Sequence, residues 1–169
     1  MNIKRYKDFK INSNFSKWFK NSKVVDKFNK PLKCYHGTRS IFKEFKSSSS
    51  IGNQGENDQI EGIYFTSNKE GASFYSLNNE KKYLMEVFLS IQNPYIVNNY
   101  KELSSNLGIE KLSEVNSKLK SLGYDGLIIE KGFYSNGGPY KLFLAFYPTQ
   151  IKSVENNGEW NPEKNDIYS

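Results

Sequence analysis

The sequence predicts an α+β fold built around an antiparallel or split β-sheet, with short helices on its flanks. Short apolar runs of strand length outnumber the stretches with helical spacing, and the two kinds follow one another in irregular order. No internal repeat is visible, and the 169 residues fit one domain of ordinary size. We therefore expect residues 1–169 to form a single domain.

The N-terminal third is expected to contribute helices and a turn. Residues 1–22 are interpreted as an N-terminal helical segment, because aromatic and aliphatic side chains lie among charges as in short amphipathic helices. Two short extended runs should follow, with a turn at Asn29 and Lys30 between them. Residues 47–61 are rich in Ser, Gly, Asn and Gln and predict a loop, which is either a lid or a plain insertion. Before this loop lies an apolar group of three residues: Ile41, Phe42 and Phe45.

The rest of the chain alternates short strands with helices. Ser67 followed by Glu70 matches a capping box, so a short helix should begin just after a strand at residues 62–66. Leucine and valine at helical spacing predict another helix over residues 109–122, which Gly123 ends. The remaining patterns predict strands at 83–91, 126–129 and 142–146, a turn-rich connection at 132–139 and a flexible tail at 155–169.

Composition excludes several classes of protein. The chain has one histidine and one cysteine, so we expect neither a metal site nor an internal disulfide. No apolar run approaches the ~18 residues of a membrane span, and the basic N-terminus lacks the apolar region of a signal peptide. We therefore expect a protein of the cytoplasm, or of a host's cytoplasm. The net charge is +6, and residues 1–46 carry 13 lysines and arginines against three acids. This excess of positive charge serves either solubility or the attraction of a polyanion or an acidic partner.

The sole histidine lies in a pattern that suggests a ligand site. His36, Gly37 and Thr38 end one predicted strand, Tyr64 lies on the next, and Tyr75 follows eleven residues later on the adjoining helix. Two aromatic faces close together form a slot for a flat cationic ring. A glycine backbone suits a carboxamide, while an imidazole and a hydroxyl suit ribose hydroxyls. These features fit nicotinamide and its riboside, although such tyrosines and a lone histidine are more often core residues.

The same stretches resemble a known enzyme family. YHGT at residues 35–38, GIYFT at 62–66 and the second tyrosine are similar to the diphtheria-toxin-like ADP-ribosyltransferases, whose His-Tyr-Glu pattern also marks the poly(ADP-ribose) polymerases. The full series of motifs along the chain resembles most closely the small bacterial and phage ADP-ribosyltransferase domains of polyvalent proteins. This resemblance implies split antiparallel sheets. The similarity spans about residues 15–158 and includes these further positions: Phe15, Trp18, Phe19, 22–26, Pro31, Leu32, Ala72, Asn93, Pro94, 123–128, Phe146, Pro148 and 150–153.

The resemblance implies roles in binding NAD, which would be a substrate. His36 would hold ribose hydroxyls, the backbone of Gly37 would bind the nicotinamide carboxamide, and Thr38 would bind a further ribose hydroxyl. Tyr64 and Tyr75 would enclose the nicotinamide ring, so that His36, Tyr64 and Tyr75 are the catalytic candidates. Arg39 is expected near the diphosphate from its charge alone. Two further positions would line the NAD site: Ala72 and Leu142.

One catalytic position departs from the family pattern. The resemblance places a glutamate eight residues before Gln150, where this chain has Leu142. Family members with an aliphatic residue there resemble mono-ADP-ribosyltransferases, in which an acidic acceptor can supply the missing carboxylate, and others only bind. Substitutes within this chain would be Glu130, Glu56, Asp58 or Glu61.

The resemblance therefore implies an NAD-dependent mono-ADP-ribosyltransferase, a glycosyltransferase that moves one ADP-ribose to a macromolecule and releases nicotinamide. The acceptor is expected to be a protein rather than a nucleic acid, with no membrane involved and the chain a monomer. A bacterial or phage effector or toxin fits this activity. Three alternatives stay open: a non-catalytic module that binds NAD or ADP-ribose, an NAD glycohydrolase with water as the acceptor, and a basic nucleic-acid-binding domain in which the motifs are incidental.

Overall fold

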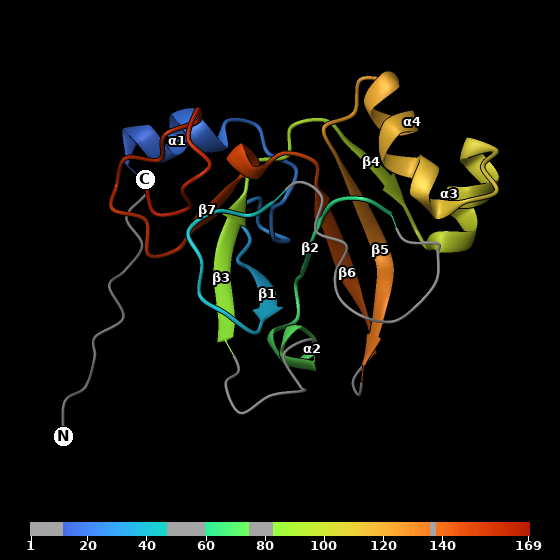
Figure 1. Ribbon diagram of the computed structural model, residues 1–169, viewed down its shortest axis with the longest axis horizontal. Helices are drawn as coiled ribbons and strands as arrows, with labels where there is room; N and C mark the ends of the chain where they lie inside the picture. The colour runs from blue at the N-terminus through green and yellow to red at the C-terminus, as the bar shows by residue number, and fades with distance from the viewer. Residues whose placement is uncertain (1–11, 47–59, 75–82, 136–137) are drawn as a thin grey trace.

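The computed structural model describes residues 12–46, 60–74, 83–135 and 138–169. These residues form one sheet in the strand order β4-β5-β6-β2-β1-β3-β7, with short helices around it (Figure 1). The strands are β1 Cys34–Thr38, β2 Ile63–Thr66, β3 Tyr83–Leu89, β4 Pro94–Val97, β5 Gly126–Ser135, β6 Gly138–Ala145 and β7 Ile151–Ser153. The helices are α1 Ser13–Phe19, α2 Lys69–Phe74, α3 Tyr100–Leu107 and α4 Val115–Ser121, with 3₁₀ turns η1 Leu112–Glu114 and η2 Pro148–Gln150.

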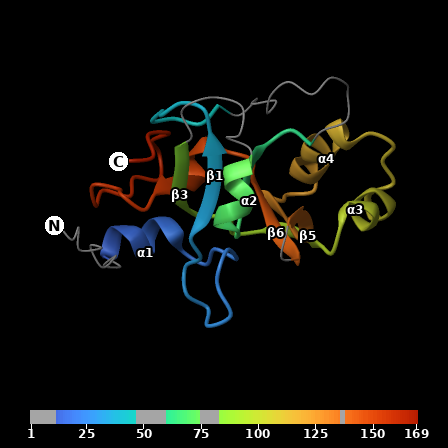
Figure 2. The ribbon, with the colours of Figure 1, turned by 90° about the horizontal axis from the view of Figure 1, so that it is seen from below.

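Neighbouring strands are antiparallel except β4 and β5, which run parallel. Helices α3 and α4 lie at the end of the sheet that carries β4 and β5, whereas α1 and the C-terminal segment lie at the end that carries β3 and β7 (Figures 1 and 2). A mixed sheet with four short helices confirms the predicted α+β class.

Two apolar clusters fill the interior on opposite faces of β2, β5 and β6. Ile63 and Phe65 belong to the first cluster, together with residues of β1, β3 and β7. Tyr64, between them in β2, packs on the second cluster, which also receives side chains of α3 and α4. Because successive side chains of a strand point to opposite faces, residues 63–65 separate the two clusters.

A network of hydrogen bonds around Asp125 joins the starts of β4 and β5 to η2. The Asp125 carboxylate accepts from the backbone nitrogens of Gln92 and Asn93, both at 2.8 Å. Gln150 Nε2 donates to the Asp125 carbonyl at 2.8 Å, and Gln150 Oε1 accepts from the backbone nitrogen of Phe146 at 2.9 Å. Charge-assisted bonds to backbone N–H groups are among the stronger polar contacts in proteins. Several motif residues of the sequence therefore hold strand ends in place.

The C-terminal segment is packed against the sheet, so the prediction of a flexible tail at 155–169 is wrong. Trp160 is 3% exposed and Ile167 is 0% exposed. The Trp160 ring meets Phe15 of α1 edge-on, with centroids 4.8 Å apart, and also contacts Trp18 and Phe88. Polar and acidic residues dominate this stretch in the sequence, and its two buried apolar side chains, Trp160 and Ile167, gave too weak a signal.

Other predicted boundaries also differ from the structure. The helix predicted over 109–122 begins only at Val115, because Gly108 ends α3 in the left-handed region and Lys111 is extended. The turn predicted over 132–139 is largely strand, since β5 and β6 pair close to their hairpin end. Asn68, not Ser67, caps α2, with Oδ1 accepting from the Gly71 nitrogen at 2.7 Å. Three elements were not predicted from the sequence: α3, β4 and β7.

Candidate functional site

A tight turn feeds the strand that carries the histidine. The carboxylate of Asp26 accepts from the backbone nitrogens of Phe28 and Lys30, at 2.8 and 2.9 Å. Asn29 has a positive φ of 59°, a conformation that asparagine tolerates better than most residues. This geometry confirms the predicted turn at Asn29 and Lys30, after which the chain enters β1.

β1 lies between β2 and β3 in the sheet (Figure 1), and the junction between β1 and β2 is here called the seam. It pairs with β3 over all five of its residues, whereas its pairing with β2 is registered at Tyr35 and Thr66. The imidazole of His36 spans this seam, with Nδ1 at 2.8 Å from the carbonyl oxygen of Tyr64. A carbonyl only accepts hydrogen bonds, so Nδ1 carries the proton and a neutral ring has its lone pair on Nε2.

Aromatic rings surround the half-buried imidazole. Its centroid lies 5.1 Å from that of Phe45, 5.5 Å from that of Phe65 and 6.4 Å from that of Phe42. Burial lowers the pKa of His36 below its ordinary value, although the bond to the Tyr64 carbonyl acts in the opposite direction. The ring is therefore neutral near pH 7. Nε2 makes no hydrogen bond within the described residues. Since no side-chain nitrogen or oxygen there is both fully buried and without a partner, Nε2 is available to a hydroxyl group.

Tyr64 meets the imidazole through its backbone rather than through its ring. Its hydroxyl donates to the Ile60 carbonyl at 2.6 Å, and its ring packs on the second apolar cluster. Phe65, which contacts His36, points to the other face of β2. Tyr75 lies outside the described residues, so the enclosure of a nicotinamide ring by Tyr64 and Tyr75 stays a prediction.

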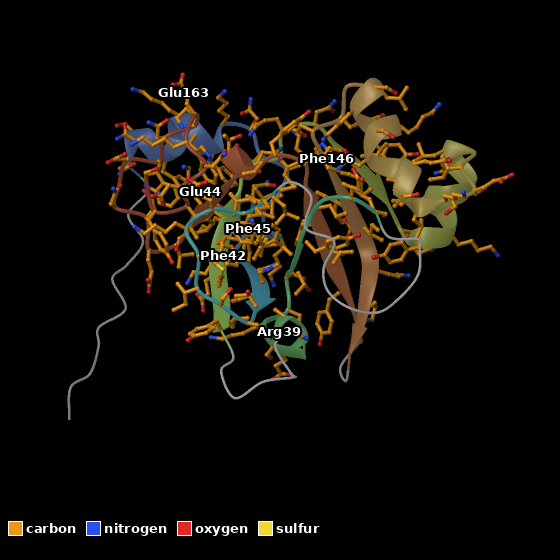
Figure 3. The ribbon with its side chains drawn as sticks, in the orientation of Figure 1. Arg39, Phe42, Glu44, Phe45, Phe146 and Glu163 are labelled. Atoms are coloured by element: carbon orange, nitrogen blue, oxygen red, sulfur yellow. The ribbon has the colours of Figure 1, made fainter. Side chains whose placement is uncertain are left out.

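Gly37 and Thr38 complete β1, and Arg39 follows at its end. Gly37 pairs with Leu84 of β3. The Thr38 hydroxyl donates to the Ser40 carbonyl at 3.2 Å and closes a local turn. Arg39 is exposed at the end of β1, as Figure 3 shows. The structure thus keeps His36, Gly37, Thr38 and Arg39 together at one strand end.

Leu142 occupies a sealed position. It is 6% exposed, lies opposite Thr66 of β2 and Ile129 of β5, and belongs to the second cluster. The pairing of β5 and β6 shifts after Ile129, and a Cβ atom on Gly132 would lie 2.5 Å from the Cβ of Leu142. Glycine is therefore required at the shift, and it packs directly against Leu142.

The acids considered as substitutes for a glutamate at 142 have different surroundings. Glu130 forms an ion pair with Lys141, with Oε2 and Nζ 2.9 Å apart and both side chains partly exposed. Glu61 is exposed. Glu56 and Asp58 lie outside the described residues, as does all of the predicted 47–61 loop except its last two positions. Ala72 is 1% exposed, so it contributes to the packing of α2, and its predicted contact with NAD stays a prediction.

Comparison with known families decides the relationship. Residues 26–161 match the family described as ADP-ribosyltransferase in polyvalent proteins. The chain belongs to this family. No curated protein and no solved structure matches the chain. Membership confirms the resemblance to ADP-ribosyltransferases, a family that uses NAD as its substrate.

Several of the motif residues that this chain shares with the ADP-ribosyltransferases of polyvalent proteins have structural roles. Asp125 and Gln150 hold strand ends, and Gly126 is needed because a Cβ atom there would lie 2.6 Å from Ile91. Sequence reasoning grouped Phe42 and Phe45 as apolar but did not place them around His36. No spacing rule could have done so, because the contact depends on the path of the chain after β1.

Three further findings concern the described residues of this ADP-ribosyltransferase domain. Among the described residues, no helix combines the length and apolarity needed to cross a bilayer. No group of three histidine, cysteine or acidic residues within the same part of the chain could hold a metal ion. A shallow hollow of about 410 Å³ lies against α3 and α4, lined by residues such as Ile109 and Lys118, and contains none of the predicted NAD residues.

Proposed function

We propose that this chain transfers single ADP-ribose units from NAD to an acceptor and releases nicotinamide. The observation that carries the proposal is the fixed, neutral imidazole of His36 at the seam between β1 and β2, in a chain of the ADP-ribosyltransferase family. With Nδ1 bound to the Tyr64 carbonyl, Nε2 can accept a hydrogen bond from a ribose hydroxyl. The ring orientation is set before NAD arrives, which reduces the entropy cost of binding.

The proposed reaction breaks one bond and forms another at the ribose C1′ atom. The electron pair of the bond between C1′ and the nicotinamide nitrogen leaves with nicotinamide, which becomes neutral. Positive charge develops on the sugar, and an acceptor atom forms the new bond to C1′ with its own electron pair. A hydroxyl acceptor would lose its proton to solvent, whereas an ionised carboxylate has none to lose. The role assigned to His36 is to orient the ribose during this exchange, while the backbone of Gly37 holds the leaving group.

The surroundings of Leu142 support transfer of one unit at a time. An aliphatic side chain sealed by Gly132 offers no carboxylate to activate the hydroxyl of a first ADP-ribose for a second transfer. The Glu130 carboxylate is engaged by Lys141. We therefore assign the missing negative charge to the acceptor and propose a protein whose Asp or Glu side chain is modified, since nucleic acids have no carboxylates.

The test uses purified protein, NAD labelled in its adenylate phosphate and a mixture of cellular proteins. We expect nicotinamide release and label on protein in equal amounts, with no ladder of polymer. The label should survive nuclease and be removed by neutral hydroxylamine, which cleaves esters of acids. NAD binding without nicotinamide release would show a binding module instead, and release with only free ADP-ribose would show a glycohydrolase.

A variant pair ties the activity to the site. His36→Ala should lower transfer by about 100-fold or more, since a group that positions substrate contributes about 10²-fold, with an unchanged circular dichroism spectrum. Lys118→Ala, in the hollow against α3 and α4, is the matched control and should keep wild-type activity. An unfolded His36→Ala protein, or one with full activity, would contradict the assigned role.

A further inference from the structure

β7 contains a lysine that is completely shielded from solvent. Lys152 is 0% exposed, and its Nζ donates to the carbonyl oxygens of Lys164 at 3.0 Å and Asp166 at 2.8 Å. Burial lowers the pKa of Lys152 to about 8, because removing an ammonium group from water is unfavourable. A methionine would fill much the same space without this penalty. The two hydrogen bonds are therefore what the lysine contributes.

The bonded carbonyls belong to the C-terminal segment 155–169, here called the strap. Its Ile167 is fully buried in the first apolar cluster, and the Ile167 nitrogen donates to the Lys43 carbonyl at 2.8 Å. Asp166 also forms an isolated β-bridge with Glu44. Lys152 thus fastens the strap at the point where the strap holds residues 43 and 44.

Phe45, which follows residues 43 and 44 in the chain, contacts the imidazole of His36. Phe45 is 5% exposed and shares the first cluster with Ile167. Its ring stands edge-on to His36, at 5.1 Å and 87°, and to Phe42, at 4.8 Å and 86°. Figure 3 shows Glu44, Phe45 and Phe42 on this segment. A continuous series of contacts therefore runs from Lys152 through the strap to His36.

We propose that Lys152 is a positioning residue for the NAD site, because it fixes the strap, the strap fixes Phe45, and Phe45 fixes the imidazole of His36. The effect of Lys152 on NAD affinity rests on the proposed function, whereas the effect of Lys152 on the environment of His36 does not. The residues bonded by Lys152 follow the stretch matched by the family, which ends at residue 161. The device thus depends on residues outside the matched stretch.

The test replaces Lys152 by methionine in the full chain and follows the proton resonances of the imidazole. The chain has one histidine, so these signals need no assignment. We expect Lys152→Met to shift them at a temperature where the protein is folded, and to weaken NAD binding by about 3- to 30-fold, the range found for coupling through contacts. Lys164→Met is the matched control, because the exposed Lys164 side chain pairs with Glu159 while its backbone carbonyl still accepts from Lys152. It should leave both readouts unchanged.

Two further variants separate positioning from general loss of stability. Leu103→Val trims the second cluster, away from the strap, and should lower stability without moving the imidazole signals. Ile167→Val should shift them in the same direction as Lys152→Met, and it decides the question if Lys152→Met does not fold. Unchanged imidazole signals in folded Lys152→Met overturn the proposal. If Lys152→Met does not fold, unchanged signals in Ile167→Val overturn it instead. A shift of equal size in Leu103→Val also overturns it. Shifted signals in a protein whose wild type binds no NAD would support the positioning of His36 while refuting the proposed function.

Discussion

At the scale of single residues, the proposed chemistry depends on how His36 is held. Phenylalanine rings and a single carbonyl surround the imidazole, and none of these partners within the described parts of the chain is an acid. The protein environment therefore favours the neutral ring, with its proton on the atom that faces Tyr64. A hydrogen-bond acceptor for ribose, rather than an acid-base pair, is what such an arrangement provides.

The lowered pKa of His36 makes stability depend on pH. In the unfolded chain the imidazole has its ordinary pKa of about 6.5, whereas burial lowers the pKa in the folded protein. Between these values the unfolded state binds more protons, so the free energy of unfolding falls as the pH decreases from about 6.5 through the lowered pKa. Urea titrations at a series of pH values should show a steeper decline for wild type than for His36→Asn. Parallel curves for the two proteins would contradict the assignment.

The position of Leu142 gives a second prediction at this scale. Leu142→Glu should not create a polymerase, because the new carboxylate would be buried against Gly132 and Ile129. Burial of an unpaired acid should lower the free energy of unfolding by about 3–5 kcal/mol, as measured by urea unfolding. Wild-type stability together with chains of ADP-ribose on a gel would show that this side chain faces the substrate after all.

At the scale of elements, the structure separates motifs that bind from motifs that hold strands. The resemblance to the family was carried partly by Asn93, 123–128 and 150–153. In the structure, Asp125 and Gln150 bond to backbone groups at the starts of β4 and β5 and to the residues just after β6. Their part in the proposed activity is therefore indirect: they join the elements on which the site is built.

Removal of the Asp125 carboxylate tests this structural role. Asp125→Ala leaves two backbone N–H groups without their acceptor and should lower the free energy of unfolding by about 2–4 kcal/mol, given about 1.5–3 kcal/mol for each bond to a charged group and partial replacement by water. Asp125→Asn keeps one acceptor oxygen and should lose about half as much. Equal stability of all three proteins in urea titrations would refute the network.

The sequence predicted elements with strong local signals and missed those that depend on distant partners. The turn at Asn29 and the strand with His36 have residue types that suit only a few conformations. By contrast, α3 has the sequence YKELSSNL, with bulky apolar residues only at Tyr100, Leu103 and Leu107, and is stabilised by burial of Leu103. Lys152 was read only as part of a motif, because a lysine gives no sign in sequence that it is buried. Contacts made through the strap could not be predicted without the fold.

At the scale of the whole molecule, the first described helix and the strap close the same end of the sheet (Figures 1 and 2). The aromatic cluster of Phe15, Trp18, Phe19, Phe88 and Trp160 joins them. The indole of Trp18 also donates to the Thr149 carbonyl at 3.0 Å. Segments 131 residues apart in sequence are thereby packed together.

This packing predicts a large effect for a residue near the end of the chain. Trp160→Ala removes a ring that contacts three other aromatic side chains and should lower the free energy of unfolding by about 3–5 kcal/mol. Glu163→Ala, an exposed position of the same segment that Figure 3 labels, is the control and should change it by no more than about 0.5 kcal/mol. Similar urea midpoints for the two variants would contradict the packing of Trp160 and support a flexible tail at 155–169.

The most direct test of the central claim is a titration of the wild-type protein with NAD, followed through the proton resonances of its one imidazole. If NAD binds at the seam between β1 and β2, these signals should move and saturate as NAD is added, and nicotinamide release should show the same concentration dependence. If the imidazole signals stay fixed while nicotinamide is released, NAD reacts elsewhere, and His36 is a core residue.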